Sequence, residues 1–83
     1  MLDEAYWWYE LQLQGLGERL LDEVELCFEK LKHTPFYYSF LDGNCRQLIL
    51  RHFPYKIIFE IIANDVIIYA IFQSSRDPDK IFE

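Results

Sequence analysis

The sequence predicts an α+β fold in which an N-terminal antiparallel helical hairpin packs on an antiparallel sheet of three or four strands. Apolar residues recur at helical spacing through the first part of the 83-residue chain. Beyond Pro35 the pattern changes to short β-prone runs separated by turn residues. Because the helices precede all the strands, we expect them to cover one face of the sheet.

The first predicted helix runs from Leu2 to Gln14. Its apolar face is formed by residues at helical spacing, namely Leu2, Ala5, Tyr6, Tyr9, Leu13 and Leu16. Trp7 and Trp8 are adjacent in sequence, so at least one of them must lie off that face. That tryptophan ring is expected either to be covered by the rest of the domain or to bind a partner.

The second predicted helix follows the turn-prone segment Gly15–Gly17, and the short connection favours an antiparallel neighbour. Its apolar stripe is the strongest helical signal in the chain and comprises Leu20, Leu21, Val24, Cys27, Phe28 and Leu31. The acidic residues on the other side are interpreted as a solvated surface. We expect this helix to end near Lys32, because Pro35 restricts Thr34 away from helical angles.

The predicted sheet is a meander of short runs joined by tight turns. The runs are "FYYSF", "CRQLILRHF", "YKIIFEIIA" and "VIIYAIF", and the turns lie at Asp42–Asn44, at Pro54 and at Asn64–Asp65. Both alternating faces of the last two runs are apolar, so both are expected to be central strands. Lys56 and Glu60 interrupt one face and are expected near the edges of the sheet.

Length and composition indicate a single domain, residues 1–83, with enough apolar residues (52%) to fill a core. The formal net charge of −6 argues against a broad basic surface for nucleic acid. No apolar run approaches the roughly 20 residues that span a bilayer, and the N-terminus is acidic where a signal peptide is basic. We therefore expect a soluble, cytoplasmic protein.

The sequence contains no motif for a metal, a cofactor or a common hydrolase. Cys27, Cys45, His33 and His52 have no zinc-ligand spacing, and the two cysteines are interpreted as reduced thiols. A glycine-rich phosphate loop, a nucleophile elbow and an HExxH motif are all absent from the sequence. We therefore expect no cofactor and no metal.

Three basic residues form a candidate anion site. If neighbouring strands bring Arg51, Lys56 and Arg76 to one end of the sheet, they form a small cationic cleft suited to a phosphate or another anion. The alternative is that they are separate surface charges, each paired with an acid such as Asp77 or Glu60. Spacing alone leaves both interpretations open.

Three segments, taken together, resemble the RelE/ParE family of toxins from type II toxin–antitoxin systems, a group that includes plasmid stabilisation proteins. They are "WYELQLQGLGERLLDEVELCFEKLKHTP" from Trp8 to Pro35, "RQLILRHFPYKIIFEI" from Arg46 to Ile61, and "VIIYAIFQSSRDPDKIF" from Val66 to Phe82. The resemblance covers nearly the whole chain in the family's order and spacing.

The resemblance implies a compact bacterial toxin that inhibits growth and is neutralised by a cognate antitoxin wrapped around its helices and sheet. RelE-like members cut messenger RNA in the ribosome, and ParE-like members inhibit DNA gyrase. RNA cleavage requires cationic groups for the developing charge and groups that move protons. Under this resemblance Trp7 and Trp8 are the candidate antitoxin-binding residues.

The resemblance places Lys56 where the RNA-cleaving branch has a catalytic arginine, Arg76 at its arginine after the last strand, and Arg51 at a further basic position. Two lysine positions of that branch are occupied here by Gln47 and Ile49, and its C-terminal tyrosine by Phe82. Charge stabilisation is therefore retained, whereas the expected proton carriers are missing.

These departures favour a ParE-like or unassigned target, with DNA gyrase as one candidate. A ribosome-dependent messenger RNA endonuclease is the enzymatic alternative, and a degenerate, non-toxic antitoxin-binding protein is another. The family's first strand has no counterpart before the first helix. Either it has been lost, or the sheet has a bare edge that an antitoxin strand completes.

Overall fold

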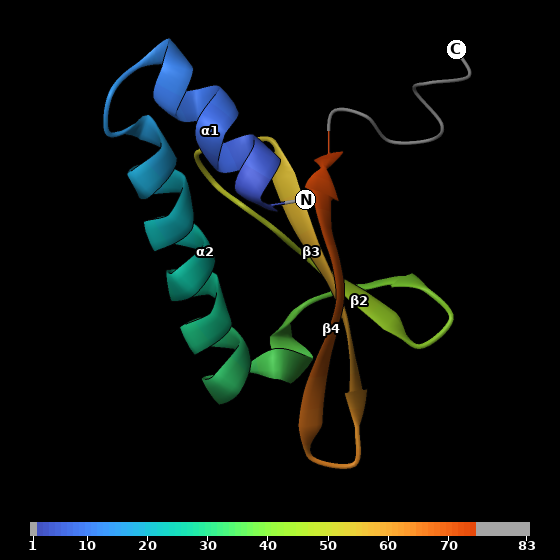
Figure 1. Cartoon of the computed structure of the whole chain (residues 1–83). Helices are drawn as coiled ribbons and strands as arrows, with labels where there is room; N and C mark the ends of the chain where they lie inside the picture. Colours follow the sequence, from blue (N-terminus) through green and yellow to red (C-terminus); the bar gives the residue numbers. More distant parts are fainter. Residues whose placement is uncertain (1, 75–83) are drawn as a thin grey trace, which may run out of the picture.

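The computed structural model describes residues 2–74 and confirms the α+β prediction (Figure 1). Helices α1 (Leu2–Gln12) and α2 (Leu16–His33) form a hairpin, and a short 3₁₀ helix, η1 (Pro35–Tyr37), leads into the sheet. The strands are β1 (Phe40–Asp42), β2 (Cys45–Ile49), β3 (Tyr55–Ile62) and β4 (Asp65–Gln73). They form an antiparallel meander in the order β1-β2-β3-β4.

The two helices are joined by contacts between Glu10 and the start of α2. Gly15 has φ +89°, a left-handed conformation that glycine adopts without strain, and it precedes the first turn of α2. The Glu10 carboxylate accepts hydrogen bonds from the backbone N–H of Gly15 (3.2 Å) and Gly17 (2.8 Å). A side chain of α1 thus satisfies N–H groups that the first turn of α2 leaves without helical partners.

Gly17 lies at a close contact between α1 and α2. A Cβ at this position would lie 2.6 Å from the Tyr6 carbonyl oxygen and 2.7 Å from Cγ of Glu10. The absence of a side chain therefore lets the two backbones meet. The turn-prone "GLG" segment predicted from the sequence has two different roles, a left-handed turn at Gly15 and a close helix contact at Gly17.

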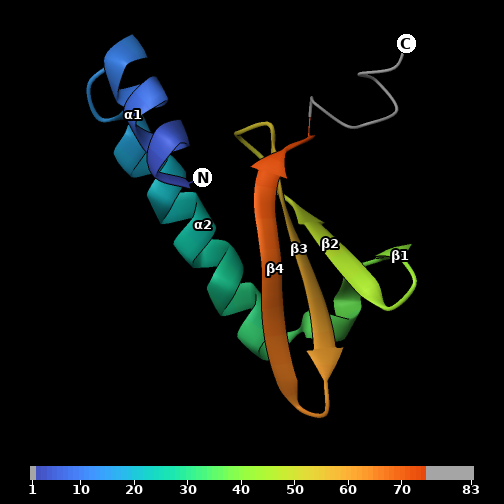
Figure 2. The ribbon, with the colours of Figure 1, turned by 45° about the vertical axis from the view of Figure 1, so that its right-hand side comes forward.

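The core lies between α2 and one face of the sheet. Both ribbon views show α2 beside the sheet (Figures 1 and 2). The predicted stripe of α2 supplies Leu20, Val24, Cys27 and Leu31, and the sheet side supplies Leu48, Leu50, Phe53, Ile57 and Phe59. Leu20, Ile57 and Phe59 have no exposed surface. Each such side chain stabilises the fold by roughly 1.5–3 kcal/mol relative to an exposed position.

Three details of the predicted elements are wrong. The run "FYYSF" begins as η1 rather than as a strand, because Pro35 fixes a helical φ at its start, and β1 contains three residues only. α1 ends at Gln12, so Leu13 lies beyond the helix and is 61% exposed instead of joining the apolar face. β4 is not central, because it ends the strand order and has one neighbour, β3, among residues 2–74.

β4 has apolar residues on both faces, but it is not buried on both faces. Ile67, Ile68 and Tyr69 are 38%, 38% and 51% exposed. The pairing with β3 shifts between Ile58 and Phe59, whose partners are Ala70 and Ile68, so Tyr69 is an extra residue in β4. Such a bulge increases the local twist of an edge strand.

None of the helices in the part of the chain described is long and apolar enough to cross a membrane.

Candidate functional site

Lys56 is the second residue of β3 and lies between the two neighbouring strands, opposite Ile49 of β2 and Phe72 of β4. Its Nζ is 5.2 Å from the centre of the Phe72 ring, within the range of a cation–π contact. The residue is near the end of its strand, on a central strand, and only 6% exposed. The prediction that Lys56 lies toward the end of a central strand is thus confirmed, and its side chain is buried there.

Arg51 lies in the connection between β2 and β3, beyond the last residue of β2, so strand alternation does not determine its direction. The residue is exposed, and its backbone N–H donates a 2.8 Å hydrogen bond to Oε2 of Glu23. Arg51 and Lys56 thus flank one turn, the first exposed and the second buried. Arg76, the third residue of the candidate anion site, lies outside the described residues, as does Phe82.

Arg46 has a structural role. Its guanidinium donates a 2.6 Å hydrogen bond to the Tyr38 carbonyl oxygen and lies 3.9 Å from the centre of the Phe40 ring. These contacts fasten the segment between η1 and β1 to β2. Glu60, considered in the sequence as a partner for one of the three basic residues, accepts a 2.7 Å hydrogen bond from the Tyr69 hydroxyl.

The contact between Glu23 and His52 was not predicted from the sequence, where His52 was considered only as a possible zinc ligand. Glu23 on α2 accepts hydrogen bonds from the backbone N–H of Arg51 and of His52 (3.0 Å), and its Oε1 lies 2.7 Å from Nδ1 of His52. A sequence signal existed. Glu23 follows Leu20 by three positions and precedes Cys27 by four, which places an acid on the flank of the buried stripe.

The electrostatics of Glu23 follow from these contacts. Burial raises the pKa of its carboxyl, but the hydrogen bonds from His52 and from the backbone of Arg51 outweigh it and hold the pKa below its usual value. Glu23 is thus an ionised acceptor at neutral pH, and it ties the β2–β3 turn to α2. The turn that carries Arg51 and leads into Lys56 is positioned by this contact.

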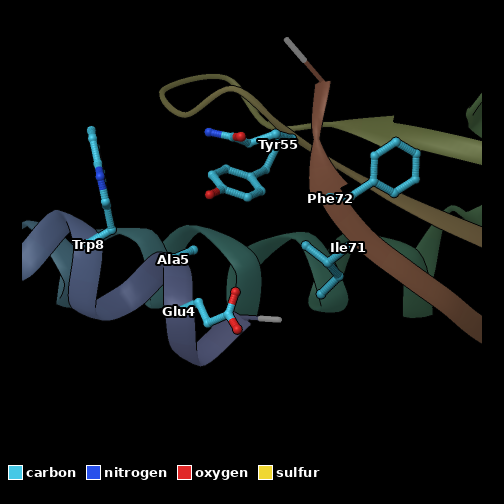
Figure 3. Close-up of a pocket in the computed structure, with 7 residues that line it drawn as sticks. Glu4, Ala5, Trp8, Tyr55, Ile71 and Phe72 are labelled. Atoms are coloured by element: carbon cyan, nitrogen blue, oxygen red, sulfur yellow. The ribbon is translucent and has the colours of Figure 1, made fainter. Parts of the chain in front are cut away.

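A hollow of about 410 Å³ lies between α1 and the second half of β4. Glu4, Ala5 and Trp8 line it from α1, and Tyr55, Ile71, Phe72 and Gln73 line it from the sheet. Figure 3 shows Trp8 and Glu4 on the helix, the Tyr55 ring above it, and Ile71 extending from β4 toward the helix. The hollow therefore combines aromatic and aliphatic walls with one carboxylate.

Trp7 and Trp8 are both exposed, at 62% and 58%, and Leu11, one turn further along α1, is 83% exposed. We refer to Trp7, Trp8 and Leu11 as the α1 apolar face. Each tryptophan makes an edge contact with a tyrosine next to it, Tyr6 for Trp7 (5.0 Å) and Tyr9 for Trp8 (4.9 Å). The prediction that at least one tryptophan lies off the core face is confirmed, since both do.

The cysteines and metal ligands offer no further site among residues 2–74. Cys27 is buried and Cys45 half-buried, and both are free thiols. Burial raises the pKa of the Cys27 thiol, which lowers its nucleophilic character. No group of three or more His, Cys, Asp or Glu side chains in this part of the chain is arranged to hold a metal ion.

The chain matches no protein-family model, no curated protein and no solved structure. What the fold defines is a small α+β protein with two N-terminal helices packed on a four-stranded antiparallel sheet.

Proposed function

We propose that this chain is the toxin component of a type II toxin–antitoxin system of the RelE/ParE kind, acting in the bacterial cytoplasm and neutralised by a cognate antitoxin. The proposal is supported by the order of motifs in the sequence together with a fold of the kind that the resemblance implies. The observation that carries it is the α1 apolar face, which leaves two tryptophans more than half exposed. Tryptophan is among the residues most enriched at the energetic centres of protein interfaces.

The antitoxin-binding surface is proposed to comprise this face and the adjoining hollow between α1 and β4. Trp8 belongs to both, because it lines the hollow and is itself 58% exposed. Asp3 and Glu4 lie on the same helix and are exposed. A partner segment with apolar anchors and basic residues complements such a surface in shape and in charge.

The target is proposed to be ParE-like or unassigned, with DNA gyrase as one candidate. The side chains paired beside Lys56 support this choice over RNA cleavage. Ile49 on one side and Phe72 on the other carry no group that moves a proton, and Gln47 pairs with Ile58 further along β3. Arg51 supplies an exposed cation at the same turn, and Arg76 is the third basic residue of the proposed anion-facing site.

The experiment is to express the chain in a bacterial host with and without the neighbouring gene of its own genome, and to follow growth, messenger RNA integrity and DNA supercoiling. Growth arrest with intact messenger RNA and disturbed supercoiling, relieved by the neighbour, is the expected result. Cleaved messenger RNA would overturn the choice of target. Unimpaired growth with folded protein present would overturn the toxin proposal.

A further inference from the structure

The outer edge of β4 is an unpaired strand edge among residues 2–74. β4 has nine residues, the longest strand of the sheet, and it pairs with β3 on one side (Figure 2). An edge strand presents a row of backbone N–H and C=O groups to any strand that approaches.

The composition of this edge offers little protection against pairing. From Val66 to Gln73 the strand contains no charged residue, no proline and no glycine. Lysine and proline are common means by which edge strands avoid association. The irregularity present is the bulge at Tyr69, which divides the edge into Val66–Ile68 and Ala70–Gln73.

The exposed side chains of β4 add apolar surface to this edge. Ile67, Ile68 and Tyr69 are each more than a third exposed, and Ile71 and Phe72 line the hollow beside α1. A strand added to β4 would therefore gain side-chain contacts on both faces as well as backbone hydrogen bonds.

We propose that two copies of this chain pair through the outer edges of β4, antiparallel and related by a two-fold axis. The charge distribution favours a second copy as the occupant. The chain carries a net charge of −6, so two copies repel each other at most surfaces. Val66 to Gln73 contains no charged residue, so two copies of this stretch can pair in any register without placing like charges opposite each other. A partner selected by opposite charge would find no charge on this stretch to recognise.

The symmetry is consistent with a closed assembly. An antiparallel pair is isologous, so each copy offers the same edge and both free edges are satisfied in one contact. Two four-stranded sheets then become continuous. In this pair, the first half of β4 in one copy lies along the second half of β4 in the other copy. The second half of β4 is the part that lines the hollow together with Trp8. This inference does not depend on the proposed function.

The first test is the mass of the purified full chain over a concentration series, measured by sedimentation or by light scattering after gel filtration. We expect a dimer of twice 10.1 kDa. Ile67→Lys should weaken dimerisation about tenfold or more, because lysine on an edge opposes strand pairing. The variant should fold, since Glu60 on β3 lies opposite residue 67 and can pair with the new lysine.

Ile62→Lys is the matched control, because Ile62 is 49% exposed on β3 and lies opposite Asp65. It adds the same charge to an exposed isoleucine that is not on the outer edge, and it should dimerise like the unaltered chain. A monomer at all concentrations, or a dimer that Ile67→Lys does not weaken, would overturn the proposal.

Amide hydrogen exchange gives a second test that requires no substitution. In an edge strand without a partner, every second N–H points outward and exchanges rapidly. We expect these outward amides between Val66 and Phe72 to become protected as the concentration rises into the dimer range. If the mass shows a dimer while they remain unprotected, the dimer uses another surface and the proposal is wrong.

Discussion

Glu23 and His52 meet with 2.7 Å between carboxylate Oε1 and imidazole Nδ1, across the junction of α2 and the β2–β3 turn. The same carboxylate accepts the backbone N–H of Arg51 and of His52 through its other oxygen. These contacts span 28 and 29 residues of sequence, so one acidic side chain holds the turn that precedes Lys56 against the helix.

Replacing Glu23 should therefore destabilise the domain. We expect Glu23→Gln to lower the free energy of unfolding by about 1–3 kcal/mol, because the backbone N–H groups of Arg51 and His52 lose a charged acceptor. The measurement is urea denaturation at pH 7. Glu25→Gln, at an exposed position on the same helix, is the control and should change stability by less than about 0.5 kcal/mol. Equal losses in both variants would show that the Glu23 contacts contribute nothing specific.

The lowered pKa of Glu23 predicts a pH dependence of stability. A carboxyl whose pKa is lower in the folded chain than in the unfolded chain stabilises the fold above its unfolded pKa, about 4.3. That contribution is lost as the pH falls through the folded value. Between pH 5 and pH 2 the unaltered chain should therefore lose more stability than Glu23→Gln. Parallel stability curves for the two proteins would contradict this assignment.

Gly17→Ala should weaken the packing of α1 on α2. The new methyl would lie 2.6 Å from the Tyr6 carbonyl oxygen, so the helices must move apart. We expect a loss of about 1–3 kcal/mol, typical of overpacking, despite the better helix propensity of alanine. Thermal unfolding measures it, with Leu26→Ala at a 57% exposed position of α2 as the control. A more stable Gly17→Ala variant would mean that the hairpin is not closely packed there.

The sequence predicted the helices and the sheet well because their signals are local. Four residues of the α2 stripe, Leu20, Val24, Cys27 and Leu31, are buried as expected, and Leu21 and Phe28 are half-buried. β4 was placed wrongly because an apolar pattern on both faces does not distinguish a strand buried by neighbours from an exposed edge, which depends on strand order. Hydrophobic periodicity thus identifies a helix or a strand, but it does not determine which strands lie beside it in the sheet.

The candidate site was predicted less completely, because its geometry depends on contacts distant in sequence. The charges of Arg51 and Lys56 predict an anion site, yet Arg51 is exposed and Lys56 is buried against Phe72. The Glu23–His52 contact joins a helix to a turn nearly thirty residues away and has no linear motif. By contrast, adjacent tryptophans cannot both lie on the core-facing side of one helix, so the exposure of at least one of Trp7 and Trp8 could be anticipated from the sequence.

Trp7→Ala and Trp8→Ala should impair antitoxin binding without unfolding the domain. Both side chains are more than half exposed, so truncation removes little buried surface. We expect each substitution to raise the dissociation constant about tenfold or more, as for interface residues whose truncation costs at least 1.4 kcal/mol. Calorimetry with the purified neighbour-encoded protein measures this. Tyr37→Ala, on η1 and 82% exposed, is the control, and equal affinity for all variants would exclude the α1 apolar face as the binding surface.

The central claim, that this chain inhibits growth through the proposed anion-facing site of Arg51, Lys56 and Arg76, is tested most directly by the growth of a bacterial host after induction of the chain alone. Arg76→Ala is the comparison, at matched amounts of folded protein. Growth should stop with the unaltered chain, continue with Arg76→Ala, and resume with the unaltered chain when the antitoxin is produced. Uninterrupted growth with the unaltered chain, or equal arrest by both proteins, would contradict the account.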